Sequence, residues 1–296
     1  MKRITIIGAN TFLGEHLITA IDNKYQDFDK NIWNYNEKLE GLEGAIQGSD
    51  MVFNLHELQD MSLMPNKIKL IKNNVEFVSE LLSYCKMANV SVSTYLQCST
   101  KWPNIYGRES DDFKQKESPF DEYCKSKFMA EQLLRDNLGG SCFDSKISII
   151  IARVGPLYGE GDRRSLVCDT LLLNRYFGFV PRIGKNEDMG VLQFTYVGNA
   201  AFFLLKVGEK LLYSSENYLC ETVIICDDTP LRDFYTLIIG GMYDLQEEQM
   251  AIPFLIFFWP YLFLCWVIQM FSSFHFNSAL NKPENIVGPS WLSPID

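Results

Sequence analysis

A chain of 296 residues can bury a large core without disulfide or metal staples, and a net charge of -10 makes it a poor partner for nucleic acid. Binding to a phosphate backbone needs clustered Lys and Arg, and the sequence has no basic stripe of that kind. Its eight cysteines lack C-x-x-C spacing, which argues against a zinc site or a disulfide framework. We therefore expect a globular protein that binds neither a metal ion nor nucleic acid.

The first half of the chain alternates short apolar runs with segments of helical spacing. The apolar runs lie at residues 4–7, 32–35, 51–55 and 92–97. Such alternation is typical of βαβ units, whose parallel strands are covered by helices on both faces. A continuous aliphatic run at 146–152 predicts one more buried strand. We therefore predict an α/β fold with a doubly wound parallel sheet of the Rossmann type over residues 1–161.

One edge unit of this sheet is missing from the pattern. Between Asn36 and the apolar run at 51–55, residues 37–48 leave no room for the usual helix and third strand. In the strand order 3-2-1-4-5-6 that third strand lies at the edge. Its loss therefore leaves the core of the sheet intact, but it exposes the second strand.

The rest of the chain divides by composition. Residues 162–248 are less regular and are interpreted as a substrate-binding region, followed by a hydrophobic segment at 249–280 and a short tail at 281–296. The uncharged stretch at 251–271 reaches the length of about 20 residues that a membrane-spanning helix needs. Its prolines weaken a simple spanning helix, so a kinked or interfacial insertion is weighed equally. The alternative is a buried helix of a soluble core.

A loop that begins and ends with glycine follows the first predicted strand. Backbone N–H groups of such a loop, at the start of a helix, can hold a pyrophosphate with help from the helix dipole. The predicted cofactor-binding residues of the loop are Gly8, Asn10, Thr11, Phe12, Leu13 and Gly14. A residue about 20 positions further along is expected to bind the ribose. Counting leads to Asn36, which can bond a hydroxyl but lacks the charge that rejects a 2′-phosphate, with Asp27 and Asp29 as alternatives.

Tyr123 and Lys127 stand four positions apart and share one face if their segment is helical. Because Ser99 and Thr100 follow a predicted strand, a hydroxyl can meet the phenol at the carboxyl edge of the sheet. Free tyrosine has a pKa of about 10, so its use as a base near pH 7 requires about 4 kcal/mol of phenolate stabilisation. An ammonium one turn away supplies much of that. The predicted catalytic residues are Tyr123, Lys127, Thr100 and Ser99, with Lys127 also expected at the cofactor. The alternative is an ordinary amphipathic helix with a surface lysine.

Several stretches, in order along the chain, resemble the 3β-hydroxysteroid dehydrogenase/Δ5-4 isomerase family of extended short-chain dehydrogenases/reductases. They are Phe12-Leu13-Gly14-Glu15-His16, Cys98-Ser99-Thr100, Tyr123-Cys124-Lys125-Ser126-Lys127, Arg153 with Tyr158-Gly159-Glu160-Gly161, Tyr196-Val197-Gly198-Asn199 and Asp227-Asp228-Thr229-Pro230. The match to the family's Thr-Ser-Ser places the catalytic hydroxyl on Thr100, with Ser99 as second choice. The resemblance implies NAD-dependent oxidation of a 3β-hydroxy-5-ene steroid to the 3-ketosteroid, with Δ5-4 isomerisation by the same protein. It also implies a steroid or sterol partner and a membrane of the endoplasmic reticulum, with a mitochondrial membrane as the alternative, and it leaves a homodimer open.

The chain departs from this family pattern in four places. Thr11 replaces a glycine, and its β-branched side chain is expected to block the dinucleotide or to strain the turn. Phe77 stands where the family has glycine in Asn-Val-x-Gly, the edge β-α unit is missing, and the chain ends at Asp296 before the usual C-terminal region. Three of these departures concern the nucleotide half. The alternative hypothesis is therefore a catalytically degenerate, membrane-associated paralogue or shortened isoform that binds sterol without turnover.

Overall fold

The structure, a computed structural model, describes residues 2–25, 27–36, 38–60, 65–88, 91–95, 122–139, 147–163, 168, 194–213, 220–227, 260, 263 and 267. The chain divides into two compact units. The first unit comprises residues 1–59, 67–161 and 195–227, and the second comprises residues 60–66, 162–194 and 228–296. The glycine loop and the Tyr–Lys pair both lie in the first unit.

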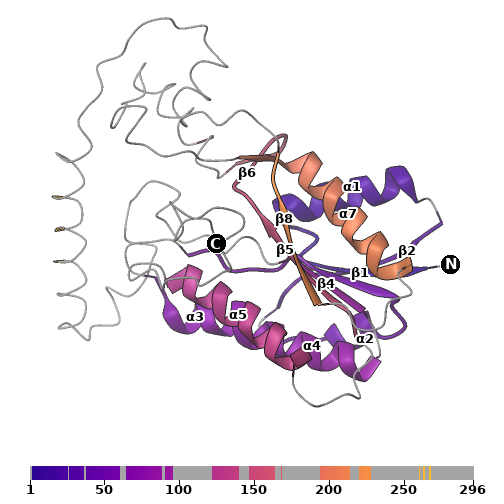
Figure 1. Cartoon of the computed structure of the whole chain (residues 1–296), viewed down its shortest axis with the longest axis horizontal. Helices are drawn as coiled ribbons and strands as arrows, with labels where there is room; N and C mark the ends of the chain where they lie inside the picture. Colours follow the sequence, from indigo (N-terminus) through magenta and orange to yellow (C-terminus); the bar gives the residue numbers. More distant parts are fainter. Residues whose placement is uncertain are drawn as a thin grey trace, which may run out of the picture. The chain divides into compact units, whose positions relative to one another are not determined.

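Within the described residues, six parallel strands form the sheet of the first unit (Figure 1). They are β1 (Arg3–Ile7), β2 (Asp29–Trp33), β3 (Met51–Asn54), β4 (Ser91–Tyr95), β5 (Ile149–Val154) and β8 (Cys220–Ile225). Their order is β2-β1-β3-β4-β5-β8, and every neighbouring pair is parallel. Two short strands, β6 (Leu157–Tyr158) and β7 (Thr195–Tyr196), pair with each other.

Helices cover both faces of this sheet (Figure 1). On one face lie α1 (Phe12–Lys24) and α7 (Val197–Tyr213), and on the other lie α2 (Leu42–Ile46), α3 (Lys67–Ile71), α4 (Phe77–Ala88) and α5 (Glu122–Gly139). A π-helical turn, η1 (Lys72–Glu76), joins α3 directly to α4. The predicted doubly wound parallel sheet of the Rossmann type is confirmed.

Successive residues of the central strands enter two separate cores. Ile4 of β1 packs with α1 and α7, whereas Ile7 packs with α4 and α5. On β5, Ile150 lies in the first core, and Ile149 and Ile151 lie in the second. All these side chains are fully buried. Because both faces of the sheet are covered, its strands β1, β3 and β5 are mostly apolar runs rather than an alternation of apolar and polar residues.

The edge of the sheet explains one departure from the family pattern. β2 is one of the two edge strands among the described strands, in agreement with the loss of an edge β-α unit beside it. Phe77 of α4 is 2% exposed and stacks on Trp33 at the end of β2, with ring centroids 5.9 Å apart. It also meets the rings of Tyr35 and His56 edge-on, at 5.2 and 5.0 Å. The phenyl ring thus fills space beside the edge strand, which gives a packing reason for a large residue at this position.

The sheet unit extends beyond the expected boundary at residue 161. Residues 195–227, which the pattern assigns to the substrate region at 162–248, return to the first unit as α7 and β8. The physical reason is that β8 pairs with β5 along its whole length, while α7 packs into the same core as α1. The change of composition after residue 161 therefore does not mark the end of the unit that contains the sheet.

Of the hydrophobic segment predicted at 249–280, the structure describes Pro260, Phe263 and Val267, and the tail at 281–296 lies outside the described residues. In the part of the chain that is described, no helix combines the length and the apolar character that crossing a bilayer requires. Association of the segment with a membrane therefore stays a prediction.

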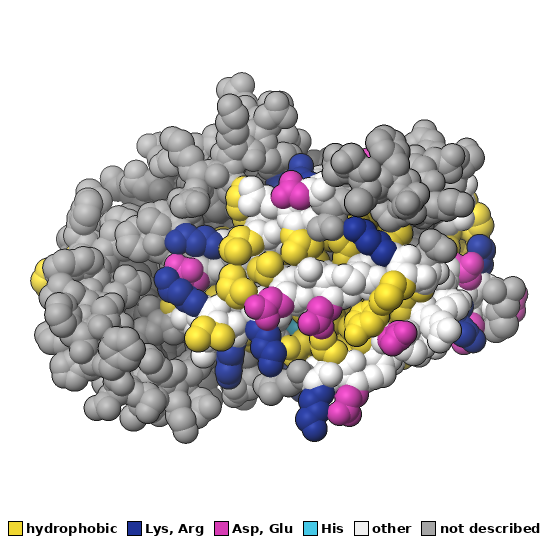
Figure 2. All heavy atoms as spheres, turned by 90° about the horizontal axis from the view of Figure 1, so that it is seen from below, with side chains coloured by type: hydrophobic (Ala, Val, Ile, Leu, Met, Phe, Trp, Pro, Cys, Tyr) yellow, Lys and Arg dark blue, Asp and Glu magenta, His cyan; other side chains and the backbone are white. Residues whose placement is uncertain are grey.

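The helix layer formed by α3, α4 and α5 exposes side chains of several kinds. Seen from below in Figure 2, acidic and basic side chains lie next to hydrophobic ones. Among the described side chains of these helices, Ile68 of α3, Met87 of α4 and Met129 of α5 are the exposed large hydrophobic ones. Scattered apolar side chains are usual on protein surfaces, so this face does not by itself indicate a partner.

Candidate active site

The loop between β1 and α1 makes a turn that requires glycine at both ends. Gly8 has a φ of +76°, and a β-carbon built on it would lie 2.8 Å from the backbone nitrogen of His56. A β-carbon on Gly14 would overlap the carbonyl oxygen of Gly8. The loop therefore packs tightly against the start of α1 on one side and the chain after β3 on the other.

Thr11 caps α1 without straining the loop. Its φ of -80° and ψ of 158° are extended, and its Oγ1 accepts a hydrogen bond from Gly14 N at 3.1 Å. The same hydroxyl donates to the carbonyl of Gly8 at 2.7 Å. The strain expected from a β-branched residue is therefore absent at this position, because threonine is favoured as an N-cap. The N–H groups of Phe12 and Leu13 have no partner within the helix and lie at the positive end of its dipole.

Asn34, rather than Asn36, reaches the glycine loop. The Asn36 side chain closes a local turn, accepting from Glu40 N at 3.1 Å and donating to the Glu40 carbonyl at 3.4 Å. Asn34 Oδ1 instead accepts a hydrogen bond from Asn10 N at 3.2 Å. The difference arises because β2 ends at Trp33, earlier than the apolar pattern predicts. The residue next to the loop at the end of the second strand is therefore Asn34.

Tyr123 and Lys127 lie one turn apart on α5, and 1% and 2% of their surfaces are exposed. The Tyr123 hydroxyl donates to Glu57 Oε2 at 2.7 Å, and the Lys127 ammonium donates to the same oxygen at 2.8 Å. Glu57 follows β3, and its side chain is 11% exposed. The two predicted residues thus share one helix face, and their donors converge on a single oxygen atom. The alternative of a surface lysine does not hold.

The π-helical turn ties the loop after β3 to α5. Asn74 of η1 accepts a hydrogen bond from Leu58 N at 2.8 Å and donates to the Leu58 carbonyl at 2.9 Å. Its Nδ2 also donates to the Ser126 hydroxyl at 2.9 Å. π-Helical turns are rare and occur frequently at functional sites. Here the turn holds the loop that carries Glu57 against the helix that carries the Tyr–Lys pair.

His56 lies after β3 and packs against the glycine loop. Its ring stacks on Tyr35 with centroids 4.1 Å apart. Burial lowers the pKa of His56 to about 4, the neighbouring Asn73 side chain opposes the shift, and the charge of Lys127 adds to it. The imidazole is therefore neutral near pH 7. Among the described residues, His56 Nε2 and Asn54 Nδ2 are buried without a hydrogen-bond partner, so a polar ligand at this segment would gain hydrogen bonds.

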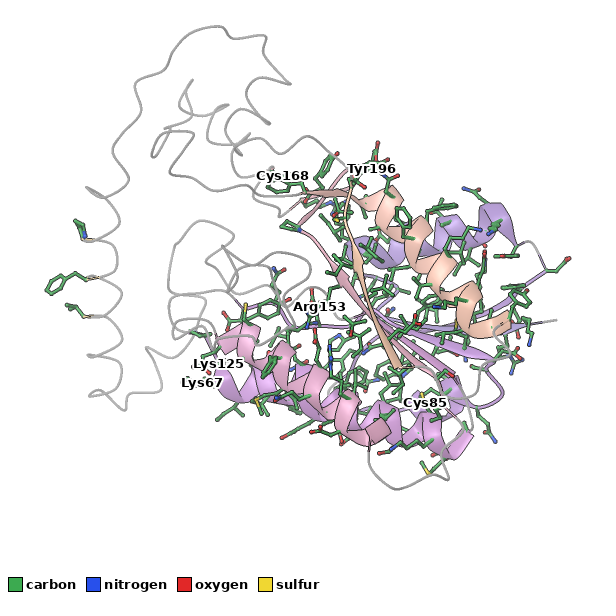
Figure 3. All side chains as sticks on the ribbon, in the orientation of Figure 1. Lys67, Cys85, Lys125, Arg153, Cys168 and Tyr196 are labelled. Carbon is green, nitrogen blue, oxygen red and sulfur yellow. The ribbon has the colours of Figure 1, made fainter. Side chains whose placement is uncertain are left out.

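Ion pairs hold α5 in place at its start and in its middle. Arg153 of β5 donates from Nε to Glu131 Oε1 at 2.8 Å and from Nη2 to Oε2 at 2.5 Å, and both residues are buried (Figure 3). Such a two-point contact is the favoured geometry of guanidinium and carboxylate. At the start of the helix, Lys67 and Lys125 contact Glu122 at 3.0 and 3.2 Å (Figure 3). The position of the Tyr–Lys pair is thus fixed by contacts outside the pair.

Sequence reasoning found only part of this site. The predicted hydroxyl residues Ser99 and Thr100 lie outside the described residues. Glu57, Asn34 and Asn74 are the residues that it missed. Asn74 could have been found from the sequence, because it is the first residue of the Asn-Val-x-Gly motif of the family. Glu57 could not, because a single acidic residue after a strand does not differ in sequence from a solvated loop residue.

Many solved structures share the fold of this chain. MoeE5 in complex with UDP-glucose and NAD has a TM-score of 0.65 and 18% identity, over 82% of this chain and 82% of that chain. The ADP-L-glycero-D-manno-heptose-6-epimerase of Helicobacter pylori has a TM-score of 0.64 and 14% identity, over 85% and 84% of the two chains. The UDP-glucuronic acid 4-epimerase of Bacillus cereus in complex with NAD has a TM-score of 0.62 and 17% identity, over 85% and 86%. At these identities the likeness shows the fold alone. No curated protein matches the sequence.

The protein combines a parallel sheet covered by helices on both faces with a glycine loop before α1 and a buried tyrosine and lysine on α5. This combination defines an extended short-chain dehydrogenase/reductase. The model of the 3-beta hydroxysteroid dehydrogenase/isomerase family matches residues 35–253. The chain belongs to this family, as the motifs predict. The matched range includes Glu57 and the Tyr–Lys pair. It does not include the glycine loop, in which Thr11 departs from the family pattern.

Proposed function

We propose that the protein is an NAD-dependent oxidoreductase that converts a 3β-hydroxy-5-ene steroid to the 3-ketosteroid. One observation carries the proposal: the Tyr123 hydroxyl and the Lys127 ammonium lie 2.7 and 2.8 Å from the same oxygen atom. That atom is Glu57 Oε2, which stands in for a hydroxyl oxygen of a substrate or of a ribose. A buried pair that holds an oxygen in this way has the geometry needed for general acid–base chemistry.

NAD is the proposed cofactor, and the residues of the first unit fit it. The tight turn at Gly8 and Gly14 and the N–H groups at the start of α1 suit a diphosphate. Asn34 is proposed to bind the adenosine ribose and Lys127 the nicotinamide ribose. When bound, NAD supplies a hydride acceptor next to the substrate carbon. Two of the structures that share the fold, MoeE5 and the Bacillus cereus epimerase, contain NAD, which supports the proposal.

Tyr123 is the base of the proposed reaction. Its phenolate takes the proton of the 3β-hydroxyl, and the Lys127 ammonium stabilises the negative charge on the phenolic oxygen. Either Thr100 or Ser99 is proposed to hold the substrate oxygen during this transfer. We also propose that the protein catalyses the Δ5-4 isomerisation, because the chain belongs to a dehydrogenase/isomerase family.

The substrate class also gives a reason for membrane association. A sterol partitions into lipid, and residues 249–280 are rich in aliphatic and aromatic side chains. We propose that the protein is associated with the membrane of the endoplasmic reticulum, with a mitochondrial membrane as the alternative.

One observation favours a second candidate, a catalytically degenerate paralogue that binds sterol without turnover. The carboxylate of Glu57 takes the position at which the pair would hold a ligand oxygen. If that carboxylate never leaves, the cofactor and the substrate hydroxyl cannot reach the pair.

Calorimetric titration with NAD separates the two candidates. The oxidoreductase is expected to give a saturable heat with millimolar NAD, because the glycine loop keeps its geometry. Gly8→Ala should abolish that heat, since the new β-carbon would meet the His56 backbone at 2.8 Å. Gly44→Ala is the matched control, because nothing lies within 4 Å of its β-carbon position. A folded protein that gives no heat with millimolar NAD contradicts the oxidoreductase and favours the degenerate paralogue.

A further inference from the structure

We infer that Glu57 is a built-in competitor for the Tyr123–Lys127 pair and sets the affinity of the site for its cofactor. The inference rests on the proposed function and deepens it. The carboxylate contacts the two groups that a dehydrogenase of this class needs, and it does so with one oxygen, Oε2. Two oxygen atoms cannot occupy one position, so a ligand hydroxyl held by both donors requires the departure of this carboxylate.

The charges of the site favour the state in which the Glu57 carboxylate contacts the Tyr123–Lys127 pair. Lys127 is 2% exposed, and a buried ammonium is costly unless an opposite charge lies next to it. Glu57 supplies that charge, whereas a ribose or substrate hydroxyl is neutral. Replacement of the carboxylate by a hydroxyl therefore leaves the ammonium without a charged partner at this point. We conclude that the carboxylate has left the pair in only a fraction of the molecules, and that only this fraction can bind cofactor. The observed affinity for the cofactor is therefore the intrinsic affinity multiplied by this fraction.

The structure also shows which movement releases the pair. The backbone on both sides of Glu57 is held, because His56 N donates to Asn54 Oδ1 at 3.2 Å and Leu58 is bonded twice to Asn74. A glutamate side chain has three rotatable bonds and changes rotamer without backbone movement. The side chain of Glu57 is not sealed in, since 11% of it is exposed. Release therefore requires rotation of one side chain and no rearrangement of the loop.

The test is a titration of NADH, followed by its fluorescence, into the wild-type protein and three variants. Glu57→Ala removes the competitor and is expected to lower the dissociation constant by about tenfold, which corresponds to a competent fraction of about a tenth in the wild type. Glu57→Gln keeps the size but removes the charge, so an intermediate tightening is expected. Glu80→Ala removes an exposed acid from α4 and should leave the affinity unchanged. In steady-state assays the KM for NAD should fall in Glu57→Ala while kcat stays constant, a split that a merely structural role would not produce.

Each outcome decides between the inference and its alternatives. If wild type binds NADH and folded Glu57→Ala binds it no more tightly, the inference is wrong and the proposed function stands. If neither protein binds NADH, both the proposed function and the inference fail. Circular dichroism establishes whether Glu57→Ala is folded. Should it fail to fold, Glu57→Gln carries the test, and an affinity equal to that of the wild type overturns the inference.

Discussion

Thr11 keeps the start of α1 intact although it replaces the middle glycine of the loop. Its hydroxyl accepts a hydrogen bond from the N–H of Gly14 and donates one to the carbonyl of Gly8. A glycine has no side chain, so with glycine at this position the N–H of Gly14 would need water or a ligand as its acceptor. The loss of a motif glycine is therefore compatible with the geometry that the motif produces.

Thr11→Ala is expected to lower the free energy of unfolding by about 1 kcal/mol, and Thr11→Gly by only a few tenths, roughly the costs of losing an N-cap hydroxyl. Urea denaturation measures both. Thr19→Ala is the control, because Thr19 is exposed within the same helix and only bonds back to the Glu15 carbonyl at 3.0 Å. A Thr11→Ala protein as stable as the wild type would show that the cap contributes nothing.

The candidate site was predictable where local spacing decides it. Tyr123 and Lys127 could be paired from the helical repeat alone, and the glycine loop from its place after a strand. Glu57 could not be predicted, because its contact with the pair joins the loop after β3 to α5, and these segments are far apart in the chain. Asn34 was missed for a smaller reason, since the end of an edge strand is poorly marked by apolar residues.

Two helices on one face of the sheet, α1 and α7, are joined by a single carboxylate. Glu209 of α7 accepts hydrogen bonds from Lys24 and Tyr25 at the end of α1, and Lys206 contacts it at 3.0 Å. Burial raises the pKa of Glu209, but these hydrogen bonds outweigh it and bring the pKa down to about 2. Burial and the same carboxylate raise the pKa of Tyr25 to about 12. The ionised carboxylate therefore stabilises the packing of α1 against α7.

The contribution of Glu209 depends on pH with a definite sign. Its folded-state pKa lies below the ordinary value of 4.5, so the stabilisation is present above that value and is lost as the pH falls towards 2. Glu209→Gln is expected to lower the free energy of unfolding at pH 7 by on the order of 2 kcal/mol, with some screening by solvent at the lysines. The difference from the wild type should shrink as the pH falls. Urea curves from pH 7 to pH 2 check this, with exposed Glu15→Gln as control, and a difference independent of pH contradicts it.

At the scale of helices and strands, the sequence indicated the central sheet and missed its far edge. β1, β3 and β5 were predictable because strands buried on both faces are continuous aliphatic runs. β8 begins with Cys220-Glu221-Thr222, in which two of three residues are polar, and the sequence before it has no regular apolar pattern, so its pairing with β5 was not evident. Such pairing depends on contacts between distant parts of the chain, which no local pattern encodes.

For the molecule as a whole, the hydrophobic residues 249–280 are the basis for a predicted attachment to membranes. The full chain, expressed in eukaryotic cells, is expected to stay in the membrane pellet after extraction with alkaline carbonate, because apolar burial in lipid does not depend on charge. A soluble marker protein is the control. Release of the chain into the supernatant would favour a buried helix of a soluble core. Homodimer formation likewise stays a prediction.

The central claim is that Tyr123, held beside Lys127, is the base of an NAD-dependent oxidation. It is tested most directly by NADH formation from a 3β-hydroxy-5-ene steroid in the wild type, Tyr123→Phe and Tyr213→Phe. We predict turnover in the wild type and a loss in kcat of at least about 100-fold in Tyr123→Phe, since the proton acceptor is removed. Tyr213→Phe should match the wild type, because Tyr213 is exposed at the end of α7. Equal turnover in Tyr123→Phe and wild type would contradict the account.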